Sequence, residues 1–376
     1  ETDNEQARFS AAELTNGTFV VVWDSNDPDT DGSGLGVGFR IMTAAGEVVG
    51  GGESIANTVT TGNQNLPDVA GTADGGFVIV YQGASFGGDT DTGVVMQKFD
   101  ANGVKVGSET LVNTLTTDIQ GDPSVEVLSN GQIAVTYSTD ATLDSVTDRN
   151  AAVKIYNPDL TVAVDEFRAN SASGNINNPQ IAPLANGQFV ITYSANTNAN
   201  IYARVLNADG TEAVAEFQVE TDSTGNQTYP EVATLDNGNF VITWQTQAGA
   251  SSSAVAARIY QPDGTPVTGE FQVSTETSLE EKNPEVPALE GGGFVVTYYT
   301  NDTPQGVRAR EYANDGTATT DVFVVEDTGA STFNPNTAVV PHADGGYSVV
   351  YNDTDASGLG VFSTTYRNPI VPTAFT

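Results

Sequence analysis

Short apolar runs that each end on an aromatic residue recur seven times along the 376-residue chain. Neighbouring aromatic residues are separated by 51 to 58 residues. They are Trp23, Tyr81, Tyr137, Tyr193, Trp244, Tyr298 and Tyr351. A fixed period of this length predicts one supersecondary unit copied seven times, and it says more about the fold than any single motif.

Each unit reads as four short β-strands. A proline recurs at the same place before the first strand in five copies. This place fits a strand start, where the missing N–H of proline is tolerated. These prolines are Pro67, Pro123, Pro179, Pro230 and Pro284. An Asn-Gly or Asp-Gly pair then predicts a type I′ hairpin, in which both central residues have positive φ. The second strand, such as Phe189–Tyr193, is β-branched and aromatic throughout, which is typical of a strand buried on both faces.

Four antiparallel strands per roughly 50 residues describe a propeller blade packed between two neighbours. Tandem immunoglobulin-like domains would need roughly 100 residues each, and a β-solenoid coil uses roughly half of this period. The sequence therefore predicts an all-β fold, a seven-bladed β-propeller with four antiparallel strands per blade. The predicted blades of this single domain, 1–376, are 1–64, 65–121, 122–177, 178–228, 229–282, 283–333 and 334–376.

The chain carries 48 acidic and 13 basic residues, which gives a formal net charge of −35. Such a charge repels nucleic acid and anionic membranes and attracts cations, so neither of the first two is an expected partner. No apolar stretch reaches the roughly 18 residues that a membrane-spanning helix needs. The chain has no cysteine. It begins with Glu1 in mid-pattern and without a signal peptide, so we expect it to be excised from a longer precursor that supplies neighbouring domains.

Length varies among the copies mainly in the loop between the second and third strands. In a four-stranded meander, these loops and the polar connections between units emerge on the same rim. Rigid blades that present variable polar loops are a usual arrangement for binding. The sequence therefore places the ligand-binding face on this rim, with emphasis on blades 1 to 3.

One of the longest of these loops contains three alternating carboxylates, Asp27, Asp29 and Asp31, followed by a glycine. Such carboxylates can converge on Ca²⁺, and the glycine allows the sharp bend. The ninth position from Asp27 is Leu35, so carbonyl groups or water would have to complete the site. Related acidic positions are Asp24, Asp89 with Asp91, and Asp353 with Asp355. The alternative is a turn that is acidic because the whole chain is rich in Asp and Gly.

Basic residues recur near the end of the third strand, and glutamates recur on the fourth. The basic residues are Arg40, Lys98, Lys154, Arg204, Arg258 and Arg310. The glutamates are Glu53, Glu109, Glu166, Glu216 and Glu270. We expect cross-strand ion pairs between the two sets, which would hold the register at the blade edge, rather than a ring of cations for an acidic ligand.

The sequence offers few groups for catalysis. His342 is the only histidine, and its place at the hairpin of the last blade predicts an exposed side chain away from the variable loops. Without cysteine or a second histidine, nucleophile–base triads and ordinary zinc sites are excluded. Paired carboxylates, as in propeller glycosidases, remain, but the sequence does not single out a pair. We therefore expect no catalytic residues and no enzymatic activity.

Five segments carry a resemblance to a known repeat. They are Asp31–Val37, Asp74–Tyr81, Phe99–Gly103, Leu111–Thr114 and Thr61–Gln64. They resemble a tandem repeat of very large secreted bacterial proteins that also contain RTX calcium-binding or cadherin-like modules. This resemblance implies an extracellular or cell-surface, calcium-containing setting and an adhesin role.

The resulting interpretation is a non-catalytic, calcium-associated adhesion module that binds a glycan or a surface protein. The alternatives are a carbohydrate-active enzyme of the propeller glycosidase type and a lectin-like glycan binder. The resemblance implies no defined ligand, so these three classes stay open at the level of the sequence.

Overall fold

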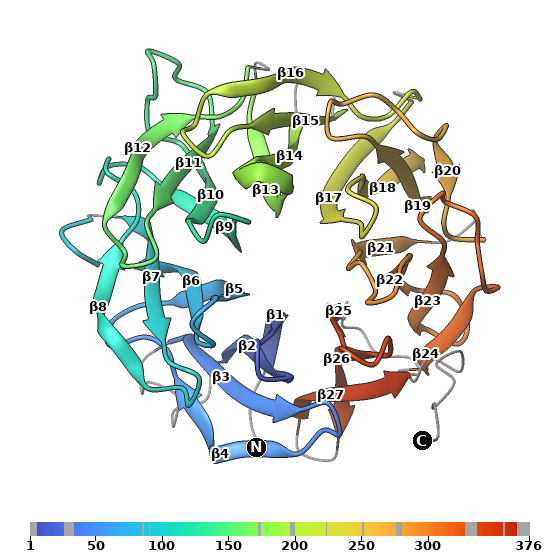
Figure 1. Ribbon diagram of the computed structural model, residues 1–376, viewed down its shortest axis with the longest axis horizontal. Helices are drawn as coiled ribbons and strands as arrows, with labels where there is room; N and C mark the ends of the chain where they lie inside the picture. Colours follow the sequence, from blue (N-terminus) through green and yellow to red (C-terminus); the bar gives the residue numbers. More distant parts are fainter. Residues whose placement is uncertain are drawn as a thin grey trace.

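The computed structural model describes residues 6–25, 34–84, 86–89, 91–171, 174–195, 200–222, 224–249, 252–275, 280–327, 337–355 and 358–366. These residues form seven separate antiparallel sheets around a central axis (Figure 1). The predicted all-β fold, a seven-bladed β-propeller, is confirmed. Helical structure in this part of the chain is limited to the 3₁₀ turn η1 (Ala185–Gly187), and no helix there is long and apolar enough to cross a membrane.

Each blade is a meander whose first strand lies nearest the axis and whose last strand lies outermost (Figure 1). Blades 1 and 2 contain β1 (Gln6–Glu13), β2 (Thr18–Ser25), β3 (Gly36–Thr43), β4 (Val48–Ile55), β5 (Gln64–Gly71), β6 (Phe77–Ala84), β7 (Thr92–Phe99) and β8 (Lys105–Leu111). Blades 3 and 4 contain β9 (Gln120–Val127), β10 (Ile133–Thr139), β11 (Asn150–Tyr156), β12 (Val162–Arg168), β13 (Ile176–Pro183), β14 (Phe189–Ala195), β15 (Asn200–Leu206) and β16 (Glu212–Gln218).

Blades 5 and 6 contain β17 (Asn226–Thr234), β18 (Phe240–Gly249), β19 (Ser252–Tyr260), β20 (Phe271–Gln272), β21 (Glu281–Glu285), β22 (Phe294–Thr300), β23 (Gly306–Tyr312) and β24 (Phe323–Asp327). In the described residues, blade 7 has three strands, β25 (Thr337–Pro341), β26 (Tyr347–Asp355) and β27 (Gly358–Tyr366). From blade 2 onward, the innermost strands begin within three residues of the boundaries that the sequence predicts.

The apolar core lies between neighbouring blades. Phe39 of blade 1, for example, packs against Phe77 and Phe99 of blade 2, with ring centroids 5.4 and 4.8 Å away. Every residue of β10, β14 and β22 is buried, which confirms second strands covered on both faces. A cluster that includes Trp23 of blade 1 and Val349 of blade 7 closes the ring between its first and last blades.

The glutamates of the fourth strands hold neighbouring blades together. Glu109 in blade 2 accepts hydrogen bonds from the backbone N–H of Thr58 after blade 1, at 2.6 Å, and from the Tyr81 hydroxyl, at 2.5 Å. Glu166 and Glu216 accept the N–H of Thr114 and Ser171 in the same way. The expected ion pairs are therefore mostly wrong. Among the described residues, one of them forms, between Arg40 Nη2 and Glu53 Oε2 at 3.8 Å.

His342 also differs from expectation. Its side chain is buried, with 6% exposure, and its ring stacks on Phe19 of blade 1 with centroids 6.2 Å apart. Burial lowers the pKa of this imidazole. A hairpin position that is exposed in an isolated blade is covered here because the last blade packs against the first.

Candidate active site

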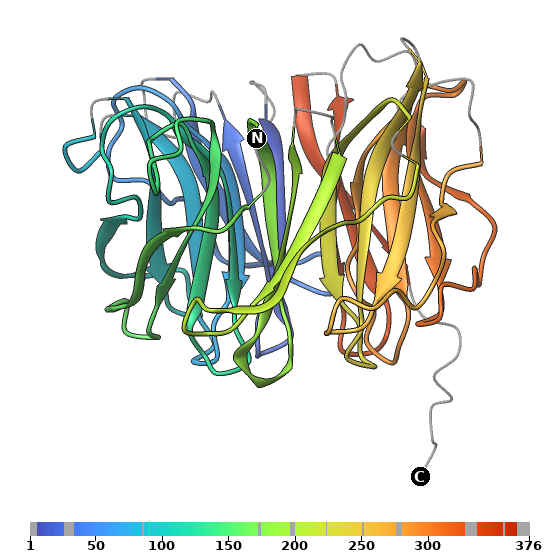
Figure 2. The ribbon, with the colours of Figure 1, turned by 90° about the horizontal axis from the view of Figure 1, so that it is seen from above.

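A cavity of about 970 Å³ lies among the innermost strands of the ring. Residues from all seven of these strands line it, and Figure 1 looks along its axis. Figure 2 shows that the strands run between the two faces of the ring. The cavity lined by the innermost strands is called the central channel. Its volume falls in the range of about 300–1,000 Å³ that is usual for ligand sites.

The innermost strands of blades 1 to 6 carry a bulge at an equivalent point. In β5, the pairing with β6 skips from Asn65 to Asp68, so Leu66 and Pro67 together lie opposite Tyr81. The sequence predicts the repeated prolines at the start of this strand. In the structure they lie inside it, so this prediction was wrong. Proline is well tolerated at this point because the bulge interrupts the ladder of hydrogen bonds that its missing N–H could not join.

The residue after the bulge lines the channel in six blades. These residues are Ser10, Asp68, Ser124, Gln180, Glu231 and Glu285. Three of the six are acidic, and they come from blades 2, 5 and 6. Ring closure therefore brings together carboxyl groups that are distant in the sequence.

Asp68 joins three blades. Its carboxylate accepts hydrogen bonds from Ser10 Oγ of blade 1 at 2.6 Å and from the backbone N–H of Val125 of blade 3 at 2.8 Å. Burial raises the pKa of Asp68, and these two hydrogen bonds offset part of that rise. The bonds fix the orientation of this carboxyl group within the channel wall.

Glu231 and Glu285 form an acidic pair across the boundary of blades 5 and 6. Burial in the channel raises both pKa values above the usual range. Repulsion from Glu285 raises that of Glu231 further, and the charge of Asp68 adds to the rise for both groups. Neither forms an ion pair with a described residue. The pair therefore retains a proton at a pH where an ordinary glutamate is ionised.

The two members of the pair have different surroundings. Gln180 Nε2 donates a hydrogen bond to Glu231 Oε1 at 2.9 Å, which favours the ionised form of Glu231. Glu285 accepts no hydrogen bond from the described residues. The geometry thus distinguishes one oriented carboxylate from one carboxyl group that is free to carry the proton.

Glu126 adds a fourth acidic group to the channel. It lies two residues beyond Ser124 on β9. Burial, with a further contribution from the charge of Asp68, raises its pKa to about 8. The channel therefore contains several carboxyl groups that hold protons near neutral pH.

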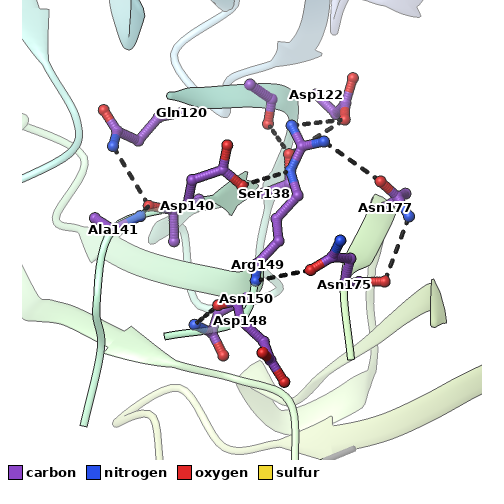
Figure 3. A network of polar contacts seen from close by, with 12 residues as sticks. Gln120, Asp122, Ser138, Asp140, Ala141, Asp148, Arg149, Asn150, Asn175 and Asn177 are labelled. Atoms are coloured by element: carbon purple, nitrogen blue, oxygen red, sulfur yellow. Dashed lines mark hydrogen bonds and ion pairs between the residues drawn. The ribbon is translucent and has the colours of Figure 1, made fainter. Parts of the chain in front are cut away.

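Arg149 connects β9, the innermost strand of blade 3, with β13, the innermost strand of blade 4 (Figure 3). Its Nη1 donates to Asn177 Oδ1 at 3.3 Å, while Nη2 lies 3.8 Å from Asp122 Oδ2 and Nε lies 3.5 Å from Asp140 Oδ1. Ser138 Oγ donates to the same Asp122 carboxylate at 3.1 Å. Because two carboxylates neutralise this guanidinium, we interpret its role as structural.

The acidic positions predicted to bind calcium do not converge in the described residues. Asp24 is buried and accepts the backbone N–H of Leu66 at 3.3 Å. Asp89 is also buried, and it accepts hydrogen bonds from Asn113 Nδ2 at 2.8 Å and from the backbone N–H of Asp91 at 3.0 Å. Within the described ranges, no group of three or more His, Cys, Asp or Glu side chains lies close enough together to hold a metal ion.

The central part of the calcium prediction lies elsewhere. Asp27, Asp29 and Asp31 fall outside the described residues. Asp353 and Asp355 belong to β26, where their backbones pair with Gly360 and Gly358. Calcium binding therefore stays a prediction from the sequence.

Sequence reasoning did not single out the channel carboxyl groups, although a signal was present. Asp68, Glu231 and Glu285 all lie seven residues before the hairpin glycine of their blades. The same position holds Ser, Gln or Ala in the other blades. A position that is polar in six of the seven copies but varies among them could have marked the channel wall.

No protein-family model matches the chain, and no curated protein matches it. Solved structures share its fold. A protein of unknown function from Dyadobacter fermentans is 12% identical, with 98% of this chain and 96% of that chain covered and a TM-score of 0.59. A fungal alcohol oxidase in complex with copper is 13% identical, with 98% and 75% covered and a TM-score of 0.61. An ulvan lyase of a polysaccharide lyase family is 10% identical, with 97% and 94% covered and a TM-score of 0.59.

These comparisons correct the expectation that the chain is not an enzyme. The solved structures that share its propeller include enzymes, among them a polysaccharide lyase and an oxidase. We therefore do not retain the non-catalytic interpretation. At such low identity the likeness shows the fold alone, so an argument about activity has to come from the channel itself.

Proposed function

We propose that this protein is a carbohydrate-active enzyme that hydrolyses glycosidic bonds in a polysaccharide at its central channel. The observation that carries this proposal is the acidic pair Glu231 and Glu285, with raised pKa values, in a cavity of suitable size. This is the carbohydrate-active alternative that the sequence left open. A polysaccharide lyase with the same fold supports the substrate class but not the hydrolytic reaction, for which the acidic pair is the argument.

Glycoside hydrolysis needs two carboxyl groups with different roles. One must be protonated at the working pH to donate a proton to the leaving oxygen, and the other must be ionised to act as nucleophile or base. We assign the proton donor to Glu285, which accepts no hydrogen bond from the described residues. We assign the ionised role to Glu231, which Gln180 orients through its amide.

Asp68 has a supporting role in this proposal. It is held by Ser10 and the backbone of Val125, so it is too well bonded to change orientation during a reaction. Its negative charge raises the pKa of both Glu285 and Glu231 and thereby helps the pair to retain a proton. Copper chemistry of the kind found in the fungal oxidase is not proposed, because the chain has one histidine and no cysteine to bind such a metal.

A secreted location fits this function, because polysaccharides are substrates outside the cell and the chain is strongly acidic. We propose an extracellular enzyme domain on this ground. The calcium-containing setting and the neighbouring domains implied by the repeat resemblance stay predictions.

The test is a hydrolysis screen on a panel of polysaccharides, read by the release of reducing ends. Glu285→Gln and Glu231→Gln should each lower the rate by about 100-fold or more. Glu290→Gln is the matched control, because this glutamate is exposed at the opposite, hairpin end of blade 6. Absence of hydrolysis on the whole panel, or a rate unchanged in both channel variants, would contradict the proposal. Unsaturated sugar ends, detected by ultraviolet absorbance, would indicate a lyase instead.

A further inference from the structure

The bulge of each innermost strand contains a residue in the left-handed region. In blades 1 to 6 this residue has φ between 45° and 53°. The six residues are Arg8, Leu66, Asp122, Asn178, Tyr229 and Asn283. All six line the channel. One backbone conformation therefore places six residues of five different kinds at the same cavity.

Asparagine and aspartate tolerate this conformation almost as glycine does, but for Arg8, Leu66 and Tyr229 it costs on the order of 1 kcal/mol or more. The chain contains 39 glycines and places one at each of the seven hairpin turns, yet it uses none at these six bulge positions. Strain of this kind is retained where the side chain has a role. Apart from Asp122, which pairs with Arg149, the variation of the side chains on a constant backbone points to ligand recognition.

Tyr229 is the member of this set best suited to a sugar. Its side chain is 46% exposed and makes no hydrogen bond to any described residue. It lies on the same strand as Glu231, with Pro230 between them, and both line the channel. An exposed aromatic ring beside an acidic pair provides a flat apolar surface for a pyranose ring and leaves the hydroxyl groups of the sugar to the carboxyl groups.

Charge defines the class of sugar. Six acidic and two basic residues line the channel. Lys282 Nζ is paired with Glu280 Oε2 at 2.6 Å, and Arg8 Nη1 lies 4.0 Å from Asp24 Oδ2. Both basic residues that line the channel in the described part of the chain therefore have a carboxylate partner, and the net charge of −35 repels an anionic glycan.

We infer that Tyr229 forms a stacking subsite for an uncharged glycan, next to Glu231 and Glu285. This inference rests on the proposed function, because that function identifies the channel as the glycan site. Its test does not depend on catalytic activity. Binding can be measured whether or not any bond is cleaved.

The experiment measures binding of the wild-type protein and its variants to two groups of probes. The uncharged probes are a β-glucan, a galactomannan and an arabinoxylan, and the anionic probes are alginate and dextran sulfate. Tyr229→Ala should weaken binding of an uncharged glycan by roughly 3- to 10-fold, and Tyr229→Phe should retain it. Phe362→Ala is the control, because Phe362 is also an exposed aromatic residue but lies on β27 outside the channel.

Thermal unfolding separates a binding role from a structural one. Tyr229→Gly should be at least as stable as Tyr229→Ala, although both lose the ring, because glycine relieves the left-handed strain. Leu66→Gly, at the same bulge in blade 2, should show the same relief against Leu66→Ala. If Tyr229→Gly is well folded but binds glycan weakly, the strained conformation of Tyr229 serves glycan binding and not stability.

The outcomes for this inference and for the proposed function are distinguishable. Glycan binding that depends on Tyr229, without hydrolysis of any probe, supports the subsite and contradicts the enzyme. Hydrolysis that depends on Glu285 but has an unchanged KM in Tyr229→Ala overturns the subsite and supports the enzyme. Tight binding of alginate or dextran sulfate, or no binding of any uncharged probe, also overturns the inference.

Discussion

The ammonium group of Lys154 in blade 3 donates a hydrogen bond to the carbonyl oxygen of Val112, which follows blade 2, at 3.0 Å. The same group bonds Thr114 Oγ1 at 3.1 Å. Arginines at the equivalent third-strand position bond carbonyl groups of the preceding blade in the same way: Arg204 with Ala169, Arg258 with Val219, and Arg310 with Val273. These basic residues therefore connect blades.

We predict that Lys154→Met destabilises the protein by about 1–3 kcal/mol, because it leaves the buried Val112 carbonyl without its donor. Lys154→Arg should be close to wild type, since blades 4 to 6 use arginine for the same contact. Denaturant unfolding of the two variants measures the difference. Equal stability of Lys154→Met and the wild type would show that the contact between the blades contributes nothing.

The pH dependence of activity provides a second prediction. The acidic pair must hold one proton, and burial raises its pKa values, so kcat/KM should remain high at neutral pH and fall on the alkaline side as Glu285 ionises. Asp68→Asn removes a negative charge that raises the pKa of Glu285. The alkaline limb should then move to lower pH by up to about one unit. An alkaline limb that stays in place would exclude this electrostatic role of Asp68.

The burial of Glu220 leads us to predict that the stability of the protein depends on pH. This glutamate is buried and its Oε2 accepts the N–H of Ile201 at 2.9 Å, where blades 1 to 3 use Asn57, Asn113 and Asn170 for the equivalent contact. Burial raises its pKa from the ordinary 4.5 to about 6. The folded state therefore binds the proton more tightly than the unfolded state does. Its stabilising contribution is complete below pH 4.5 and is lost as the pH rises through about 6.

The change in the free energy of unfolding caused by Glu220→Gln should therefore be more favourable at pH 7 than at pH 4.5. The difference between the two changes should be on the order of 1–2 kcal/mol. Unfolding curves at the two pH values measure this. Glu47→Gln, at an exposed hairpin residue, is the control and should have the same effect at both. An equal effect of Glu220→Gln at both pH values would contradict the prediction.

Calcium provides the fourth prediction. If Asp27, Asp29 and Asp31 bind Ca²⁺, calcium should raise the thermal midpoint of the wild-type protein above its value in chelator at matched ionic strength. The Asp29→Ala/Asp31→Ala variant should lose this increase. Both proteins should fold without calcium, because the core is formed by packing between blades. An equal increase in both proteins would indicate charge screening or other sites.

The fold could be predicted because its signals are local and repeated. The period of the aromatic residues and the second strands buried on both faces suffice for a ring of seven blades. The predicted turn type was wrong at the first hairpin. The Asn16-Gly17 hairpin is not type I′: among its residues, Gly17 has positive φ (78°) and Asn16 does not, and Asn16 Oδ1 accepts the N–H of Thr18 at 2.9 Å. Asn-Gly fits this longer turn equally well, so the pair does not distinguish the two.

The candidate site could not be predicted in the same way. Asp68, Glu231 and Glu285 come from three blades, and their proximity arises only when the ring closes. The sequence predicts a site in the Asp27 loop because the carboxylates of this loop are neighbours along the chain. Contacts between distant residues, such as the bonds from Ser10 and Val125 to Asp68, leave no comparable trace in one sequence.

The left-handed bulges have a consequence for engineering. Since the backbone takes the same shape with Arg, Leu, Asn or Tyr, these positions can be substituted without redesign of their blades. A combinatorial library at positions 8, 66, 178, 229 and 283 would alter the wall of one cavity from five directions, while Asp122 is kept for its pairing with Arg149.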